Sequence, residues 1–317
     1  MAYQMTTYTG RNFYEVTSAM QNAIRKGDYE VAGYCMWELI PEYTPYLRKR
    51  LLVISAEDCF GVITKEIMAL TDIGTKEDLT KALALMCAAK KNRDADYFVC
   101  NLMYTDNPTG ASKDELSRML FTAIRKMKVA EAGSISAELF KKNRKALWKA
   151  LVEMAQTYHP HLESEVIALR EANWRMSKPG EETIFAAKAI VLMWTAREPK
   201  EGLLGWPGMK FDRLLYPTEI PVIKTIDECE RIRGLFPDWA YNWHTTHGKY
   251  DLRRDAVHAI ANDQRLLHPL EESLFDDCSW NRDINACLQK WNPQRHPTPY
   301  DDGKLDPKVK FAQYREG

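Results

Sequence analysis

A stretch near the N-terminus recurs 100 residues later, and this repeat constrains the possible fold more than any other feature of the sequence. Residues 23–39 align with residues 123–139 without a gap (123 − 23 = 100). The residues shared by the two copies include Ala23, Ile24, Arg25, Lys26, Ala32, Gly33, Glu38 and Leu39, which match Ala123, Ile124, Arg125, Lys126, Ala132, Gly133, Glu138 and Leu139. We therefore expect residues 10 to about 200 to contain one helical unit repeated twice.

The repeated sequence has helical periodicity. Phe13, Val16, Met20 and Ile24 follow one another at spacings of 3, 4 and 4, which places them on one face of a helix. The same kind of pattern predicts helices over residues 28–40, 45–58, 62–72, 76–90 and 97–103, and again over 113–127, 129–142, 143–157, 161–175 and 180–196. No segment alternates with a period of two, so the sequence predicts an all-α fold.

Local signals mark where several of these helices begin. Asp28 is a predicted N-cap, and Thr44 before Pro45 has the same pattern. Ser112 and Glu115 have the spacing of a capping box, which opens the second unit. The helices expected in the second unit follow the order of those in the first unit.

The composition changes after about residue 198. Seven prolines and glycines crowd the segment from Pro199 to Pro221, residues 236–249 are rich in aromatic side chains, and the tail from Asn292 is polar. We therefore expect three regions, residues 1–105 and 106–200 as two tandem similar helical bundles and residues 201–317 as an irregular, loop-rich extension.

Composition excludes several classes of protein. The chain has 317 residues with 44 basic and 44 acidic side chains, so nucleic-acid binding would need a local basic patch. Seven cysteines with no Cys-x-x-Cys pair predict reduced thiols and a cytoplasmic protein. No signal peptide or apolar membrane span is expected, and no phosphate-binding loop motif occurs, so the sequence predicts no membrane association and no nucleotide cofactor.

Two groups of residues raise the question of catalysis. His244 and His247 would share one face of a helix, and a metal site there would need a third ligand such as Asp238 or Asp251. This is the alternative hypothesis, a metal-dependent hydrolase, but a hydrogen-bonded aromatic cluster is the favoured interpretation. The carboxylates of Ser55-Ala-Glu-Asp58 do not recur in the second unit, so a structural role is favoured for them over acid–base chemistry.

Basic clusters recur near the expected helix ends, at Arg25-Lys26, Arg48-Lys-Arg50, Lys90-Lys-Asn-Arg93, Arg125-Lys126 and Lys141-Lys-Asn-Arg-Lys145. The candidate residues for binding nucleic acid or a protein partner are Arg48, Lys49, Arg50, Lys90, Lys91, Arg93, Trp239, Trp243 and Lys249. Cations near a helix C-terminus also gain from the helix dipole without any ligand. Matched clusters in two stacked units would form a basic groove that contacts phosphates.

Residues 12–100 carry a resemblance to a known family. Ile24-Arg-Lys-Gly-Asp28, the segment from Leu47 to Asp58 that ends in Ser-Ala-Glu-Asp, and the alanine-rich stretch from Leu83 to Asn92 occur in the order and spacing of one domain. This domain is the C-terminal, collar-forming domain of the MgsA-type AAA+ ATPases, which are replication-associated recombination proteins related to clamp loaders. Residues 237–249 resemble a late segment of the same proteins more weakly. The ATPase module of that family is absent from this sequence.

The resemblance implies a role in DNA replication or recombination. It implies an oligomerisation domain whose partners are a clamp-loader-like ATPase or another replisome component, with DNA as a further ligand and a homo-oligomer as a further expectation. It carries over no catalytic residue, because the nucleotide-binding module is missing. We therefore expect a non-enzymatic protein that binds partners.

Overall fold

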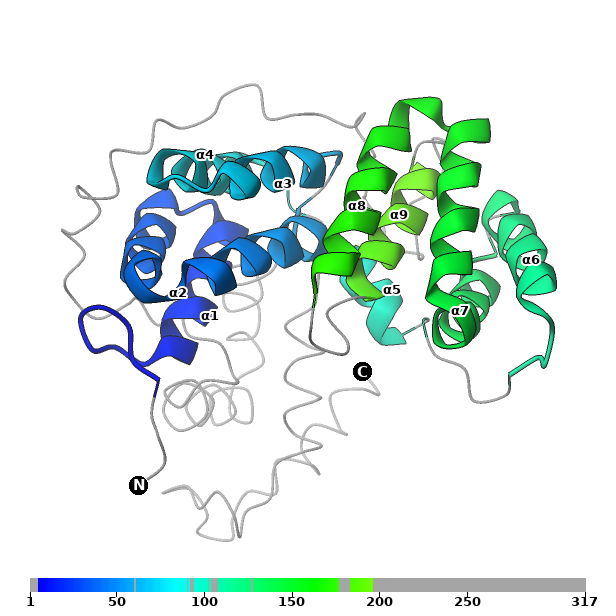
Figure 1. Cartoon of the computed structure of the whole chain (residues 1–317), viewed down its shortest axis with the longest axis horizontal. Helices are drawn as coiled ribbons and strands as arrows, with labels where there is room; N and C mark the ends of the chain where they lie inside the picture. The colour runs from blue at the N-terminus through cyan, green and yellow to red at the C-terminus, as the bar shows by residue number, and fades with distance from the viewer. Residues whose placement is uncertain are drawn as a thin grey trace, which may run out of the picture. The chain divides into compact units, whose positions relative to one another are not determined.

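The computed structural model describes residues 5–59, 61–89, 91, 94–101, 103, 108–126, 128–176 and 183–195. All regular secondary structure in these residues is helical, which confirms the predicted all-α class (Figure 1). The helices are α1 (Phe13–Lys26), α2 (Tyr29–Glu57), α3 (Thr64–Ile73), α4 (Lys76–Ala88), α5 (Asp94–Asn101), α6 (Lys113–Arg125), α7 (Val129–Tyr158), the short 3-10 helix η1 (Pro160–Leu162), α8 (Glu163–Arg175) and α9 (Thr183–Thr195).

Two compact units contain the described residues. The first is formed by residues 5–44 and the second by residues 45–195. The boundary falls inside α2, where Tyr43 leaves the helical conformation with φ −119° and ψ 21°. Pro45 explains the kink. In a regular helix its ring would clash with the carbonyl of residue 41, and Pro45 has no N–H to donate to that carbonyl. The region predicted over 1–105 therefore spans both units, and the boundaries at 105 and 200 stay a prediction.

In the first unit, the ends of the helices are fixed by side chains that the sequence provides. The carboxamide of Asn12 accepts hydrogen bonds from the backbone N–H groups of Tyr14 and Glu15 at 2.9 and 3.2 Å and caps α1. Gly27 ends α1 with a φ of 72°, a conformation that favours glycine. Asp28 then accepts from the N–H of Val31 at 3.0 Å, which confirms its predicted capping role.

The hydroxyl of Thr44 behaves differently from its predicted role. It donates a hydrogen bond to the carbonyl of Ile40 at 2.6 Å. The helix therefore continues through Thr44 with a kink, where the sequence pattern had predicted a loop between two separate helices. A threonine hydroxyl that bonds back to the carbonyl four residues earlier often accompanies a bend in a helix.

The second unit is a cluster of helices around large apolar side chains. Helix α6 packs on α7, α3 on α8, and α9 on both α5 and α8. Trp148 and Trp194 are fully buried, and each indole N–H has an acceptor, the side-chain oxygen of Asn173 at 2.7 Å and the carbonyl of Ile124 at 3.1 Å. A buried indole N–H needs a hydrogen-bond acceptor. Here the two acceptors lie on other helices, so the bonds connect α7 to α8 and α9 to α6.

The capping box at Ser112 is present as predicted. The Ser112 hydroxyl accepts from the N–H of Glu115, and the Glu115 carboxylate accepts from the N–H of Ser112 at 2.9 Å. Helix α7 kinks at Asn143, where φ is −160° and ψ is 88°, and the Asn143 side chain accepts from the N–H of Ala146 at 2.9 Å. The two helices predicted over 129–142 and 143–157 are thus the two arms of one kinked helix.

The described helices include none with both the length and the apolar composition that crossing a bilayer requires. The predicted C-terminal extension, residues 201–317, lies outside the described residues.

Candidate functional site

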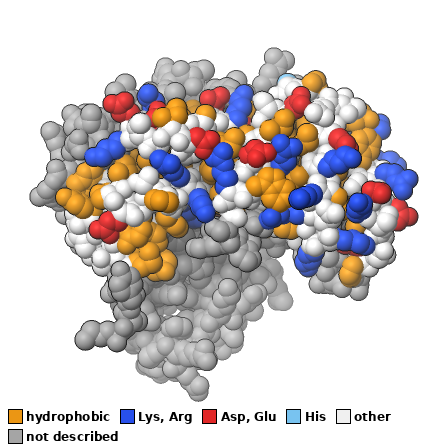
Figure 2. Space-filling model, in the orientation of Figure 1, with side chains coloured by type: hydrophobic (Ala, Val, Ile, Leu, Met, Phe, Trp, Pro, Cys, Tyr) orange, Lys and Arg blue, Asp and Glu red, His pale blue; other side chains and the backbone are white. Residues whose placement is uncertain are grey.

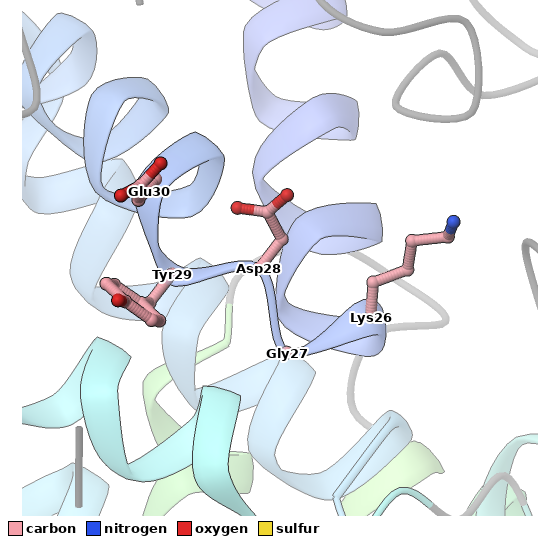
Figure 3. Close-up of a pocket in the computed structure, with 5 residues that line it drawn as sticks. All are labelled: Lys26, Gly27, Asp28, Tyr29 and Glu30. Atoms are coloured by element: carbon pink, nitrogen blue, oxygen red, sulfur yellow. The ribbon is translucent and has the colours of Figure 1, made fainter. Parts of the chain in front are cut away.

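A shallow cavity of about 340 Å³ lies at the turn between α1 and α2 (Figure 3). It is lined by Lys26, Gly27, Asp28, Tyr29 and Glu30. Partial burial lowers the pKa of Lys26, and the nearby Asp28 carboxylate offsets part of that effect. The Lys26 and Tyr29 side chains point to opposite sides of the turn, so the cavity does not bring a base and a nucleophile together.

Glu38 forms a buried hydrogen-bond cluster in the first unit. Its carboxylate accepts from the hydroxyls of Thr7 and Tyr34 at 2.8 and 2.5 Å, and from both the N–H and the hydroxyl of Thr9 at 3.0 and 2.5 Å. Burial alone would raise the pKa of Glu38, but the hydrogen bonds from Thr9, Tyr34 and Thr7 outweigh burial and hold this pKa below its usual value. The ionised carboxylate thus fixes the segment before α1 onto α2.

Glu138 makes the corresponding contact in the second unit. Its carboxylate accepts from the N–H of Thr109 at 2.8 Å and from the Thr109 hydroxyl at 3.0 Å. The backbone hydrogen bond from Thr109 is the main cause that lowers the pKa of Glu138. Thr9 and Glu38 therefore have an equivalent pair, Thr109 and Glu138, 100 residues along the chain.

A second buried polar cluster joins four helices of the second unit. Glu165 at the beginning of α8 accepts from the backbone N–H groups of Thr64 and Lys65 at 2.9 and 3.0 Å. These are the first two residues of α3, so Glu165 caps a helix from which it is separated by about 100 residues. Burial raises the pKa of Glu165, and its two backbone donors and Lys188 offset part of that rise.

Lys188 on α9 completes this cluster. Its ammonium group donates a hydrogen bond to the carbonyl of Cys59, just after the end of α2. Burial lowers the pKa of Lys188, while the charges of Cys59, Glu165 and Asp94 oppose that change. A buried lysine with a lowered pKa can act as a nucleophile, but here the ammonium group is directed at a backbone carbonyl, and the cluster serves to hold helix ends together.

Ser55 and Asp58 belong to the same buried region. The Ser55 hydroxyl lies 2.7 Å from the carbonyl of Leu52 and 3.1 Å from the hydroxyl of Thr64, so it connects the end of α2 to the first residue of α3. Both Ser55 and Asp58 are inaccessible to solvent. This placement agrees with the structural role that the sequence favoured for Ser55-Ala-Glu-Asp58.

The predicted basic residues on α2 and after α4 have different environments. Arg48 donates from Nη2 to the carbonyl of Gly74 at 3.3 Å, Arg50 is half-buried, and Lys49 is exposed. Lys91 donates from Nζ to the carbonyls of Met86, Cys87 and Ala89 at 2.8, 3.0 and 2.5 Å, at the C-terminus of α4. Arg48 and Lys91 therefore stabilise helix ends, as the dipole argument allows.

The structure does not describe the other predicted site residues, which are Lys90, Arg93, Trp239, Trp243, Lys249 and the two histidines His244 and His247. No group of three His, Cys, Asp or Glu side chains in the described ranges is arranged to hold a metal ion. Cys35, Cys59 and Cys87 are buried free thiols, and burial raises the pKa of Cys35 well above its usual value.

The largest local excess of positive charge lies on α6 and α7. Residues 113–158 contain ten Lys or Arg and five Asp or Glu, a formal net charge of +5 (10 − 5) in a chain whose total is zero. Figure 2 shows blue side chains gathered over the region of α6, α7 and α8. The cation of Arg144 lies 4.3 Å from the ring centre of Trp174 on α8, which is 36% exposed. The recurrence of basic clusters predicted part of this surface, but the position of Trp174 beside it required the fold.

Glu165 and Lys188 were not among the predicted site residues. Their partners lie about 100 and 129 positions away in sequence, so spacing could not have brought them together. One signal was available, because Lys188 is the single charged residue in the apolar run from Ile184 to Trp194.

In comparisons with protein-family models, curated proteins and solved structures, the chain matches none of them.

Proposed function

We propose that this protein acts by binding and not by catalysis, as a helical scaffold in DNA replication or recombination. The observation that carries the proposal is the uneven distribution of charge. A chain with 44 basic and 44 acidic side chains carries a net charge of +5 over residues 113–158. A concentrated basic surface on a neutral protein serves to bind phosphates or acidic partners.

The buried ionisable groups support the same proposal. Glu38, Glu138 and Glu165 each accept from backbone N–H groups of another segment, and Lys188 donates to a backbone carbonyl. Groups with these partners stabilise the fold, since a buried carboxylate or ammonium group needs hydrogen bonds wherever it lies. They supply the rigidity that a scaffold needs.

We further propose that the scaffold arose by internal duplication. Three features recur at the offset of 100 residues. The N-caps of α1 and α6 are Asn12 and Ser112. The contact between Thr9 and Glu38 recurs as that between Thr109 and Glu138. The kinks of α2 and α7 lie at Tyr43 and Asn143. Repeated helical units present extended surfaces for partners.

The place of action and the partners rest on the sequence resemblance. Residues 12–100 resemble the collar domain of the MgsA-type ATPases, so we propose a clamp-loader-like ATPase or another replisome component as the protein partner, in a cytoplasmic setting. Oligomerisation through the helical units is part of the same proposal. The buried free thiols of Cys35, Cys59 and Cys87 agree with a reducing compartment.

An affinity pull-down of the full chain from host extract tests the proposal. We expect replication or recombination proteins or DNA to be recovered, and nuclease treatment would separate the direct protein partners from those held through DNA. Recovery of neither class from extracts at low salt would contradict the proposal. Bound zinc or manganese at unit stoichiometry in the purified chain, together with hydrolytic activity, would favour the alternative of a metal-dependent hydrolase.

A further inference from the structure

The strongest surface feature outside the family-like residues 12–100 is a group of cations beside an exposed indole. We define the α7 basic face as Lys141, Arg144, Lys145 and Lys149 on α7 together with Trp174 on α8. Lys141, Lys145 and Lys149 are exposed, and residues 141–149 contain no acidic side chain. We propose that this face binds single-stranded nucleic acid, with the cations on the phosphates and Trp174 stacked on a base. The inference rests on the proposed binding function and assigns it a ligand and a site.

The position of the indole follows from the packing of α7 on α8. Trp148 is buried and bonded to Asn173, so this side of α7 faces α8. Arg144 lies one turn before Trp148 and therefore projects on the same side, over the neighbouring residue Trp174. The guanidinium group of Arg144 makes a cation–π interaction with the indole and so orients it. Proteins that bind single-stranded nucleic acid often combine such cation–π contacts with the stacking of bases on aromatic side chains.

Lys145 follows Arg144 directly in the sequence, and Lys149 follows the buried Trp148. Lys145 and Lys149 are four residues apart and share one face of the helix. Lys149 forms an ion pair with Glu153 at 3.7 Å, with the two side chains 76% and 59% exposed. An exposed ion pair of this kind contributes little to stability, so a phosphate can replace the carboxylate at small cost.

Three of the four cations lie together on one arm of α7. Arg144, Lys145 and Lys149 follow the kink at Asn143 and span about 7.5 Å of helix at 1.5 Å per residue, while Lys141 precedes the kink. An acidic peptide would satisfy the cations equally well, but its carboxylates do not stack on an indole, whereas every nucleotide carries a base that can stack on Trp174. The combination of cations and an exposed indole therefore favours single-stranded nucleic acid over an acidic protein.

The test is fluorescence anisotropy of the full chain with a labelled single-stranded oligonucleotide at about 50 mM salt. We expect the double variant Lys145→Glu/Lys149→Glu to weaken binding at least tenfold and Lys145→Gln/Lys149→Gln to weaken it less. Trp174→Ala should weaken binding at least about fivefold, and Trp174→Phe should retain most of the affinity because it keeps an aromatic face. The matched control is Lys76→Glu/Lys81→Glu, which changes the charge equally at two exposed positions on α4 and should bind like the parent.

Parallel titrations separate the possible ligands. Single-stranded DNA and RNA share the required chemistry, so tighter binding of either one supports the inference and identifies its source. Equal binding of duplex DNA, together with no effect of Trp174→Ala, would overturn the inference. Polyglutamate that competes as well as the unlabelled oligonucleotide would also overturn it, in favour of an acidic protein partner. Thermal melting by circular dichroism would confirm that each variant is folded.

The outcomes also distinguish this inference from the proposed function. If the parent binds DNA and Lys145→Glu/Lys149→Glu binds equally well, the α7 basic face is not the site, while the general binding function stands. If no oligonucleotide binds but the pull-down recovers replication proteins, the inference alone is overturned. If neither experiment shows binding, both proposals are overturned.

Discussion

At the scale of single residues, two glutamates perform the same task 100 positions apart. Glu38 and Glu138 accept hydrogen bonds from Thr9 and Thr109, in the segments that lead into α1 and α6. A glycine with a positive φ directly follows each threonine, Gly10 at 84° and Gly110 at 72°. In both units the carboxylate fixes the preceding threonine segment to the helix. Only the ionised carboxylate has acceptor sites for all of these donors, and hydrogen bonds to a charged acceptor are stronger than those to a neutral one.

The pH dependence of stability tests this role at Glu38. The pKa of Glu38 is lowered in the folded state, whereas an unfolded glutamate titrates near about 4.3. Its contribution is therefore complete above the unfolded pKa and is lost as the pH falls through the folded pKa. We expect Glu38→Gln to lower the free energy of unfolding by about 1–3 kcal/mol at pH 7 and by less at about pH 3.5, measured by urea denaturation. Glu153→Gln at an exposed position is the control, and an equal loss for Glu38→Gln at both pH values would contradict the account.

Gly74 offers a second test at this scale. Its φ is 68°, and a Cβ at this position would clash with the guanidinium group of Arg48. Gly74→Ala should therefore cost about 1–2 kcal/mol of backbone strain and also displace Arg48 from its hydrogen bond. Gly110→Ala provides the matched control, since Gly110 has a φ of 72° and nothing within 4 Å of its Cβ position. We expect Gly74→Ala to lower the free energy of unfolding about 1 kcal/mol more than the control. Equal losses in the two variants would show that Arg48 contributes nothing there.

At the scale of helices, local sequence signals predicted most of the elements. The Asp28 cap, the Ser112 capping box and the apolar spacing from Phe13 to Ile24 act within a few residues of one another, so they can be identified without the fold. The sequence predicts a loop where the structure has a kink at Tyr43, because two prolines indicate a break in the helix but do not show how many residues leave the helical conformation.

The candidate sites were less predictable than the helices. Basic clusters are visible in the sequence, but only packing shows that Arg48 and Lys91 are bonded to backbone carbonyls and that Arg144 lies over Trp174. The cap that Glu165 provides for α3 depends on contacts across about 100 residues, which no local pattern contains.

Removal of the Glu165 carboxylate tests this long-range cap. Glu165→Ala leaves two backbone N–H groups at the beginning of α3 without their acceptor, and it removes one of the carboxylates that interact with Lys188, where Asp94 remains. We expect a loss of about 2–4 kcal/mol in the free energy of unfolding, measured by urea denaturation. The control is Glu163→Ala in the first turn of the same helix, where the carboxylate bonds to exposed Gln156 and should contribute less than about 1 kcal/mol. Equal losses in the two variants would contradict the assigned role of Glu165.

At the scale of the whole molecule, a chain of zero formal charge carries an excess of positive charge over α6, α7 and the turn between them, which we propose binds nucleic acid. The net charge of +5 over residues 113–158 is balanced by acidic residues elsewhere in the sequence. Total charge alone therefore predicts weak binding, whereas a local basic face predicts binding that depends strongly on ionic strength. The salt dependence of the affinity distinguishes these two expectations.

The most direct measurement is the affinity of the full chain for a single-stranded oligonucleotide over a series of salt concentrations. If the four cations of the α7 basic face each neutralise one phosphate, the logarithm of the binding constant should fall linearly with the logarithm of the salt concentration, with a slope of about −3. The variant Lys145→Glu/Lys149→Glu should show a shallower slope, because fewer counterions are released. No measurable binding by the parent at low salt, or an affinity that does not change with salt, would contradict the account.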